Sequence, residues 1–178
     1  MLKRFVLILV FAALAVGFAS RPFWRLVYPF PHRVAISREA RLAGLDPRVV
    51  AAVIKVESNF APMAISQKGA VGLMQVMPKT AQWVAKTNNW SLTNTQLFDP
   101  DTNIKIGTWY LGYLFRQFNG LTLAIAAYNG GRGNVAKWRA GLSTNKGFDY
   151  KRIPYLETRF FVQRVLFTYQ FYRWLYSP

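Results

Sequence analysis

The 178-residue sequence contains no cysteine and only one histidine. The lack of cysteine excludes a disulfide framework, thiolate metal sites, a cysteine nucleophile and a lipid-modified N-terminal cysteine. The single histidine, His32, lies in a proline-flanked segment, which argues against a Ser-His-Asp triad and against multi-histidine metal sites. We therefore expect a protein that works without a metal and without a cofactor.

Acidic residues are also scarce. Any acid–base chemistry must draw on seven side chains, which are Glu39, Asp46, Glu57, Asp99, Asp101, Asp149 and Glu157. The formal net charge is +16, and from Arg33 onward 19 Lys and Arg stand against these 7 acids, a balance of +12. The bases form no run of five or more. Such a dispersed basic surface suits nucleic acid, an anionic membrane face or an acidic cell-wall polymer, and composition does not choose among them.

Hydrophobic residues make up 52% of the chain, which is enough for one domain with a full core. The N-terminus resembles an export signal, because Lys3-Arg4 is followed by fifteen uncharged residues, 5–19. That run is short for a membrane span, but the aromatic residues Phe23 and Trp24 follow it directly. Both a cleaved signal and a retained anchor fit, and we favour the anchor. We divide the chain into a signal peptide or anchor (1–20), a Pro/aromatic linker (21–32) and one domain (33–178).

The rest of the sequence predicts helices. Asp46-Pro47 and Asp99-Pro100 each place an acid at the N-cap and proline at the first helical position. Apolar periodicity and glycine stops predict helices over 33–43, 47–57, 78–86, 100–118, 121–128, 135–140 and 154–176. No stretch shows sustained strand alternation and no repeat is visible, so we expect an all-α domain.

Glu57 lies where a buried helix face meets a polar loop. Val50, Val53 and Ile54 form an apolar stripe, and Glu57 is the next position along it. A carboxylate there costs roughly several kcal/mol if it stays charged and unpaired. Spacing alone leaves two interpretations open: an acid working in a cleft, or a helix-terminal glutamate that bonds backbone amides.

Four motifs in order then resemble a known family. They are Glu57-Ser58, Gly72-Leu73-Met74-Gln75, Ala127-Tyr128-Asn129-Gly130 and Ile153-Pro154-x-x-Glu157-Thr158-Arg159. The sequence from about residue 31 to 176 resembles the soluble lytic transglycosylase (SLT) domain of the lysozyme-like superfamily. The resemblance implies a lysozyme-like all-α catalytic domain that acts on bacterial peptidoglycan.

The resemblance also implies the chemistry. Glu57 would be the only catalytic acid/base, cleaving the β-1,4 bond between N-acetylmuramic acid and N-acetylglucosamine and leaving a 1,6-anhydro ring. Two-carboxylate glycosidases need a second acid across the bond. Asp99 and Asp101 are explained by helix capping and Asp149 lies in a predicted loop, so a single-acid mechanism agrees with the composition.

The resemblance implies further residues of the glycan cleft. Ser66 and Gln75 match polar cleft positions, Met77 an apolar one, Tyr128 a tyrosine facing the acid, Asn129 the cleft edge and Glu157 a buried glutamate near the glycan. Each also has a plain structural interpretation: core packing for Met77 and Tyr128, a turn for Asn129, and a favourable first-turn charge for Glu157. Ser58 either orients Glu57 or has no such role.

The expected partners are peptidoglycan glycan strands and, through the N-terminal segment, the cytoplasmic membrane. We expect an exported monomer on the outer face of that membrane or in the cell wall or periplasm, where it takes part in wall remodelling or turnover. The alternatives are a lysozyme-type hydrolase, a silent glycan-binding wall module and a nucleic-acid-binding protein. The export segment and the dispersed charges disfavour the last of these, and we expect no nucleic acid partner.

Overall fold

The fold is a set of packed helices, seen in a computed structural model that describes residues 4, 20–144 and 147–177. The helices are α2 (Arg21–Val27), α3 (Arg33–Ala43), α4 (Pro47–Ser58), α5 (Pro78–Thr87), α6 (Pro100–Phe118), α7 (Leu121–Gly130), α8 (Arg132–Leu142) and α9 (Leu156–Leu175), with the short 3₁₀ turns η1 (Asn94–Phe98) and η2 (Tyr150–Arg152). The strands β1 (Ser143–Thr144) and β2 (Gly147–Phe148) form one two-residue antiparallel pair. The predicted all-α class is confirmed.

The predicted signal peptide or anchor lies outside the described residues, apart from Arg4 and Ser20. Within the described part of the chain, every helix is too short or too polar to cross a membrane.

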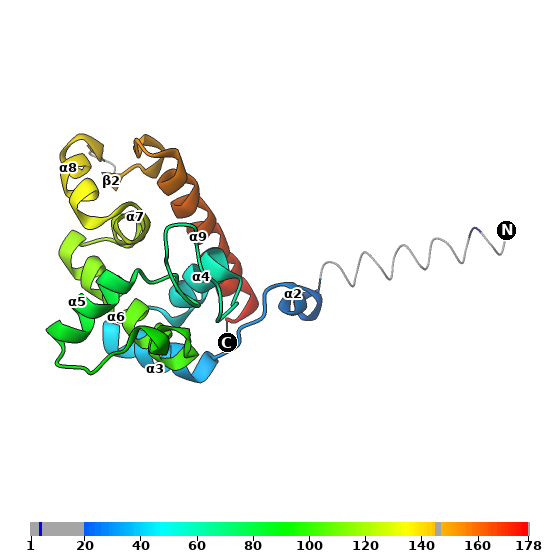
Figure 1. Cartoon of the computed structure of the whole chain (residues 1–178). Coiled ribbons are helices and arrows are strands. Elements are labelled where there is room, and N and C mark those ends of the chain that lie inside the picture. Colours follow the sequence, from blue (N-terminus) through cyan, green and yellow to red (C-terminus); the bar gives the residue numbers. More distant parts are fainter. Residues whose placement is uncertain (1–3, 5–19, 145–146, 178) are drawn as a thin grey trace.

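Helix α4 is the centre of the core. Its residues 49–54 are buried, and α9 packs along one side of it while α3 packs on another (Figure 1). Helix α6 packs on both α3 and α7, and so connects these two helices. Glu57 follows the buried residues of α4 along the same helix face. Its side chain therefore lies at the edge of the core.

The start of α4 is capped as predicted. The Asp46 Oδ1 atom accepts a hydrogen bond from the Arg48 backbone N–H at 2.9 Å, and the Arg48 guanidinium pairs with Oδ2 at 2.8 Å. The Tyr169 hydroxyl on α9 also donates to Oδ2, at 3.1 Å. The cap therefore also ties α4 to α9. Asp99 caps α6 more simply, through Thr102 alone.

We expect Asp46→Ala to lower the free energy of unfolding by about 2 kcal/mol, the upper end for a helix cap, because Arg48 and Tyr169 lose their partner too. The matched variant Asp99→Ala should cost about 1 kcal/mol. Urea unfolding of both proteins measures the difference. Equal losses would mean that the contacts of Asp46 with Arg48 and Tyr169 add nothing.

Helix α9 begins two residues later than predicted. Pro154 was expected at the first helical position, but the helix starts at Leu156 with Tyr155 as its N-cap. The Ile153 carbonyl explains the shift, because the Arg159 side chain donates to it twice, at 3.0 and 2.7 Å. The carbonyl that would have continued the helix upstream is thus occupied by a side chain.

Part of the predicted linker is also helical and belongs to the folded unit. Residues Arg21–Val27 form α2, and Arg25 on it donates to the Leu175 carbonyl at the end of α9, at 2.9 Å. The Tyr172 and Tyr176 hydroxyls bond the Pro29 and Tyr28 carbonyls at 2.7 and 2.9 Å. These contacts join the two ends of the chain.

Candidate active site

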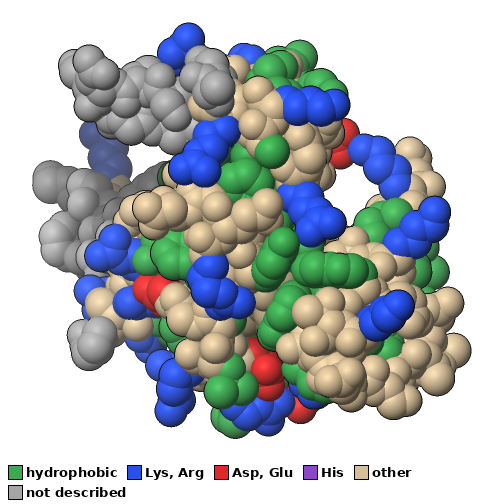
Figure 2. Space-filling view, turned by 90° about the vertical axis from the view of Figure 1, so that its left-hand side faces the viewer, with side chains coloured by type: hydrophobic (Ala, Val, Ile, Leu, Met, Phe, Trp, Pro, Cys, Tyr) green, Lys and Arg blue, Asp and Glu red, His purple; other side chains and the backbone are tan. Residues whose placement is uncertain are grey.

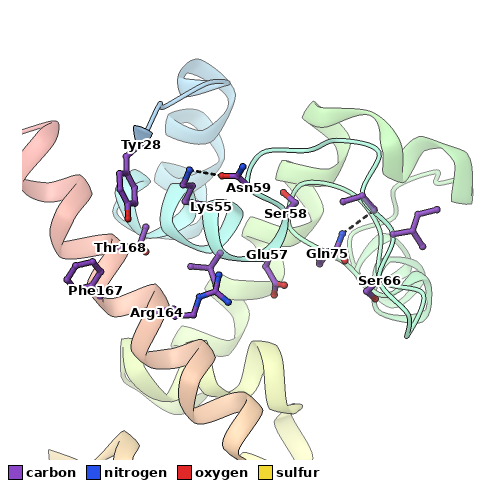
Figure 3. A pocket seen from close by; sticks show the side chains of 13 residues that line it. Tyr28, Lys55, Glu57, Ser58, Asn59, Ser66, Gln75, Arg164, Phe167 and Thr168 are labelled. Carbon is purple, nitrogen blue, oxygen red and sulfur yellow. Dashed lines mark hydrogen bonds between the residues drawn. The ribbon is translucent and has the colours of Figure 1, made fainter. Parts of the chain in front are cut away.

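Glu57 projects from the last turn of α4 into a pocket of about 660 Å³. The helix ends at Ser58, and Asn59 follows in the left-handed conformation with φ of 52°, which turns the chain away. Figure 3 shows the pocket between α9, which contributes Arg164, and the loop that carries Ser66 and Gln75. The predicted residues Glu57, Ser66 and Gln75 therefore share one pocket.

The loop 59–77 is held in shape by its own polar groups. Gly72 has φ of 78° and its N–H donates to the Ala64 carbonyl at 2.9 Å. Gln75 also has a positive φ, 48°, and its side-chain amide donates to the Ala64 and Gly72 carbonyls at 3.1 and 2.9 Å. Ser66 accepts the Ala70 N–H at 3.0 Å. Gln75 and Ser66 thus build the pocket wall as well as lining it.

A fully buried amide, Asn103 on α6, fixes the centre of this loop. Its Oδ1 accepts the Met74 N–H at 2.8 Å, while its Nδ2 donates to the Val71 and Leu97 carbonyls at 2.9 and 2.8 Å. Gly72 lies directly against it, so that a Cβ atom there would clash with the Asn103 amide. Sequence reasoning missed Asn103. Its only sequence signal is that it is a polar residue near the start of a predicted helix.

Two hydroxyls tie the loop to the helices around Glu57. Ser58 donates to the Leu73 carbonyl at 2.7 Å, so its role is to join the end of α4 to the loop. Tyr128 on α7 donates to the Met74 carbonyl at 2.8 Å. Burial, and after it the charge of Glu57, raises the pKa of Tyr128 well above its usual value. The Tyr128 hydroxyl is therefore a neutral donor that is committed to the loop.

The environment of Glu57 favours its protonated form. Burial raises the pKa of this carboxyl from 4.5 to about 8; Arg164 lowers it in part and Glu157 raises it further. Both of those residues are on α9. A carboxyl with this pKa is about nine-tenths protonated at pH 7, so it has a proton to give.

The other predicted cleft residues lie next to this pocket. Met77, Tyr128 and Asn129 line a smaller hollow of about 180 Å³, and Gln75 borders both cavities. Tyr128 and Asn129 are in the last turn of α7, which runs on to Gly130, so Asn129 is not part of a separate turn. The two hollows share Gln75 as a wall residue, and we call them together the groove.

The expectation that Glu157 is buried is wrong. Its side chain is 70% exposed and lies 2.9 Å from the Lys68 ammonium, which comes from the loop 59–77. The Glu157 carboxylate is in the first turn of α9, where the helix dipole favours a negative charge. Water and the Lys68 ammonium stabilise that charge at the surface. Glu157 lines neither hollow, but its charge reaches Glu57.

Part of the pocket wall was not predicted from sequence. Those residues are Tyr28, Lys55, Arg164, Phe167 and Thr168. Lys55 donates to the Val27 carbonyl at 2.9 Å and to Asn59 Oδ1 at 2.6 Å, and its ammonium lies 5.1 Å from the centre of the Tyr28 ring. Most of these residues become neighbours only through the packing of α2 and α9, which no local pattern indicates.

Basic side chains are spread over the molecule, as the sequence indicated. On the face drawn in Figure 2, Lys and Arg are scattered over the surface without forming one cluster. In the ranges that the structure describes, no group of three or more His, Cys, Asp or Glu could hold a metal ion.

The model of the family described as "Transglycosylase SLT domain" matches residues 35–150. The chain belongs to this family. The soluble lytic murein transglycosylase of Salmonella typhimurium is 37% identical over 154 residues, covering 82% of this chain and 23% of the relative. The SLT match ends before α9, so the Arg164 side of the pocket lies beyond it.

Solved structures agree with the family. The 70 kDa soluble lytic transglycosylase of Escherichia coli superposes with a TM-score of 0.81 at 32% identity, over 88% of this chain and 26% of that one. An inactive Glu→Gln mutant of the lytic transglycosylase Slt from Pseudomonas aeruginosa gives a TM-score of 0.77 at 37% identity, over 84% and 25% of the two chains. The chain thus spans about a quarter of the length of these proteins.

Proposed function

We propose that this SLT domain is a peptidoglycan lytic transglycosylase in which Glu57 is the only acid/base. The observation that carries the proposal is the buried Glu57 carboxyl with a pKa of about 8, the one carboxyl among the described residues of the pocket. The similarity to lytic murein transglycosylases supports the choice of peptidoglycan as substrate. The inactive Glu→Gln mutant of the Pseudomonas aeruginosa protein supports a glutamate as the essential group.

In the proposed reaction, the Glu57 carboxyl gives its proton to the oxygen between N-acetylmuramic acid and N-acetylglucosamine. The bond from that oxygen to C1 of the muramic acid then breaks. The C6 hydroxyl of the same sugar attacks C1, and the Glu57 carboxylate takes the hydroxyl proton. One C–O bond forms for the one that breaks, Glu57 regains its proton, and no water is consumed.

The surroundings of Glu57 fit both halves of this cycle. A pKa near 8 lets the carboxyl donate at neutral pH and still lets its conjugate base accept a proton from the sugar. Arg164 lowers the pKa of Glu57, so it stabilises the transient carboxylate. Ser66 and Gln75 provide polar groups along the glycan, and Met77, Tyr128 and Asn129 extend the groove. Glu157, with Lys68, lies outside both hollows as a contact for longer strands.

A lysozyme-type hydrolase is the second candidate, on the same fold and with the same acid. Among the residues that the structure describes, no other Asp or Glu lines the Glu57 pocket, whereas two-carboxylate hydrolases place a second acid across the bond. A silent glycan-binding module has no need of a buried, protonated carboxyl. Both facts favour the transglycosylase.

The product decides between these functions. Purified sacculi digested with the protein should release muropeptides that end in 1,6-anhydromuramic acid, detected by mass spectrometry as products lacking one water relative to reducing ends. Reducing ends alone would show a hydrolase, and the absence of released fragments would indicate a binding module. The enzyme is proposed to act outside the cytoplasmic membrane, in wall remodelling or turnover, with residues 1–20 directing its export.

A further inference from the structure

Apolar side chains of α2 and α9 form one surface where the two helices meet, through the contact of Trp24 with Phe171. We call it the aromatic surface; it consists of Phe23, Trp24, Leu26 and Val27 from α2 and of Phe167, Phe171 and Trp174 from α9. Trp24 and Trp174 each lie 5.3 Å from the Phe171 ring, measured between ring centres, and Phe167 lies 6.3 Å from it. Leu26 is 80% exposed and Phe167 65% exposed. These two side chains are largely in water, whereas Trp24 and Phe171 are half-buried.

Three arginines lie beside this surface. Arg21 lies 5.8 Å from the Trp174 ring centre, Arg25 lies 5.3 Å from that of Tyr176, and Arg173 is exposed on the same end of α9. Residues 20–38 and 158–178 contain no Asp or Glu. The carboxylate that bonds to α9, Asp46, is engaged by Arg48 and Tyr169. The aromatic surface is therefore rimmed by arginines.

We propose that the aromatic surface rests in the headgroup region of an anionic phospholipid bilayer. Trp and Phe with flanking Arg is the composition of protein segments that lie in a membrane interface, where arginines pair with anionic headgroups. The chain itself points to this occupant, because only Ser20 separates the fifteen uncharged residues 5–19 from the start of α2. The folded domain thus contacts the bilayer directly, in addition to any contact made by the N-terminal segment.

This contact would set the position of the catalytic pocket. Phe167 belongs to the aromatic surface and also lines the pocket of Glu57, and Tyr28, which follows α2, lines it as well. The pocket therefore opens beside the bilayer. If the proposed function holds, the enzyme cuts glycan strands that lie close to the membrane, whereas the bilayer contact itself does not depend on that function.

The absence of cysteine allows a direct test on the full-length chain. Leu26→Cys and Gln170→Cys place one spin label each on α2 and on the exposed side of α9, and both side chains are exposed. Leu42→Cys, at the end of α3, is the control, because Leu42 is 78% exposed and lies outside the aromatic surface. Accessibility to oxygen and to a water-soluble nickel complex is then measured by electron paramagnetic resonance in phosphatidylcholine vesicles with and without phosphatidylglycerol.

In the anionic vesicles, the labels at 26 and 170 should lose nickel accessibility several-fold and gain oxygen accessibility, while the label at 42 stays in water. The effect at 170 should weaken in neutral vesicles. A label at 170 that is as exposed as the one at 42 would overturn the proposal, since the N-terminal segment would then be the only contact. Spin–spin broadening at 170 would also overturn it by indicating a second copy on the surface, and equal shielding in both vesicles would rule out recognition of anionic lipid. None of these readings requires enzymatic activity.

Discussion

Glu57→Gln is expected to lower turnover by about 10³-fold or more, because the residue makes both proton transfers in the proposed reaction and general acid–base catalysis alone contributes about 10²–10⁴. The amide keeps the shape and polarity of the carboxyl, so the protein should fold and still bind glycan. Release of anhydro-muropeptides measures turnover, and sedimentation with sacculi measures binding. Release close to that of the unmodified protein would refute the assignment of Glu57.

The control is Glu157→Gln, which removes the other acid near the site. The exposed pair with Lys68 contributes little stability, and the charge of Glu157 raises the pKa of Glu57. This variant should therefore keep most of its turnover at pH 7. Because the pKa of Glu57 falls, its activity should decline at a slightly lower pH than that of the unmodified protein when the pH is raised. A loss as large as that of Glu57→Gln would mean that Glu157 takes part in the chemistry.

The pH dependence of stability shows whether Glu57→Gln loses activity because it lacks the acid or because it unfolds. The pKa of Glu57 is raised in the folded state to about 8, from 4.5, so the folded state holds the proton more tightly. Stability is then full below pH 4.5 and falls as the pH rises through 8, by at most about 5 kcal/mol at 1.36 kcal/mol per pH unit. Glu57→Gln lacks this loss. At pH 9 it should unfold at a higher urea concentration than the unmodified protein, although we expect it to be inactive.

Much of the site could be predicted because its signals are local. The Asp46-Pro47 cap and the stripe of Val50, Val53 and Ile54 identify α4 from adjacent residues, and they place Glu57 where the stripe ends. The groove residues came from the family resemblance, and the structure brings Ser66 and Gln75 to the pocket and Met77, Tyr128 and Asn129 to its extension.

The features that were missed depend on contacts between distant parts of the chain. Helix α2 is seven residues long, too short to be stable alone in water. It is supported by α9, through the Arg25 bond to Leu175, 150 positions away. The ion pair of Glu157 is likewise made with a distant residue, Lys68, 89 positions away. Sequence periodicity predicts which face of a helix is buried. It does not predict which distant segment supplies the hydrogen-bond or ion-pair partner of a side chain on that helix.

Asn103 is the strongest such case. Helical position and flanking residues mark it only as one polar residue near the start of α6, yet it is completely buried and makes three bonds to the backbone. An unsatisfied buried polar group costs about 1–3 kcal/mol, so a side chain that satisfies three of them is worth more than any single cap in the domain. It holds the loop that carries Ser66 and Gln75 against the helices.

Asn103→Ala should therefore lower the free energy of unfolding by about 3–5 kcal/mol, since the Met74 N–H and the Val71 and Leu97 carbonyls lose their partner together. The matched control is Asn88→Ala, which removes one bond to the Val84 carbonyl at a partly exposed site and should cost about 1 kcal/mol. Urea unfolding measures both losses. Hydrogen exchange locates the first, because the Met74 amide should lose protection in Asn103→Ala alone. Equal stability of the two variants, with the Met74 amide still protected, would show that the loop keeps its shape without Asn103 and that Ser58 and Tyr128 are sufficient to hold the pocket wall.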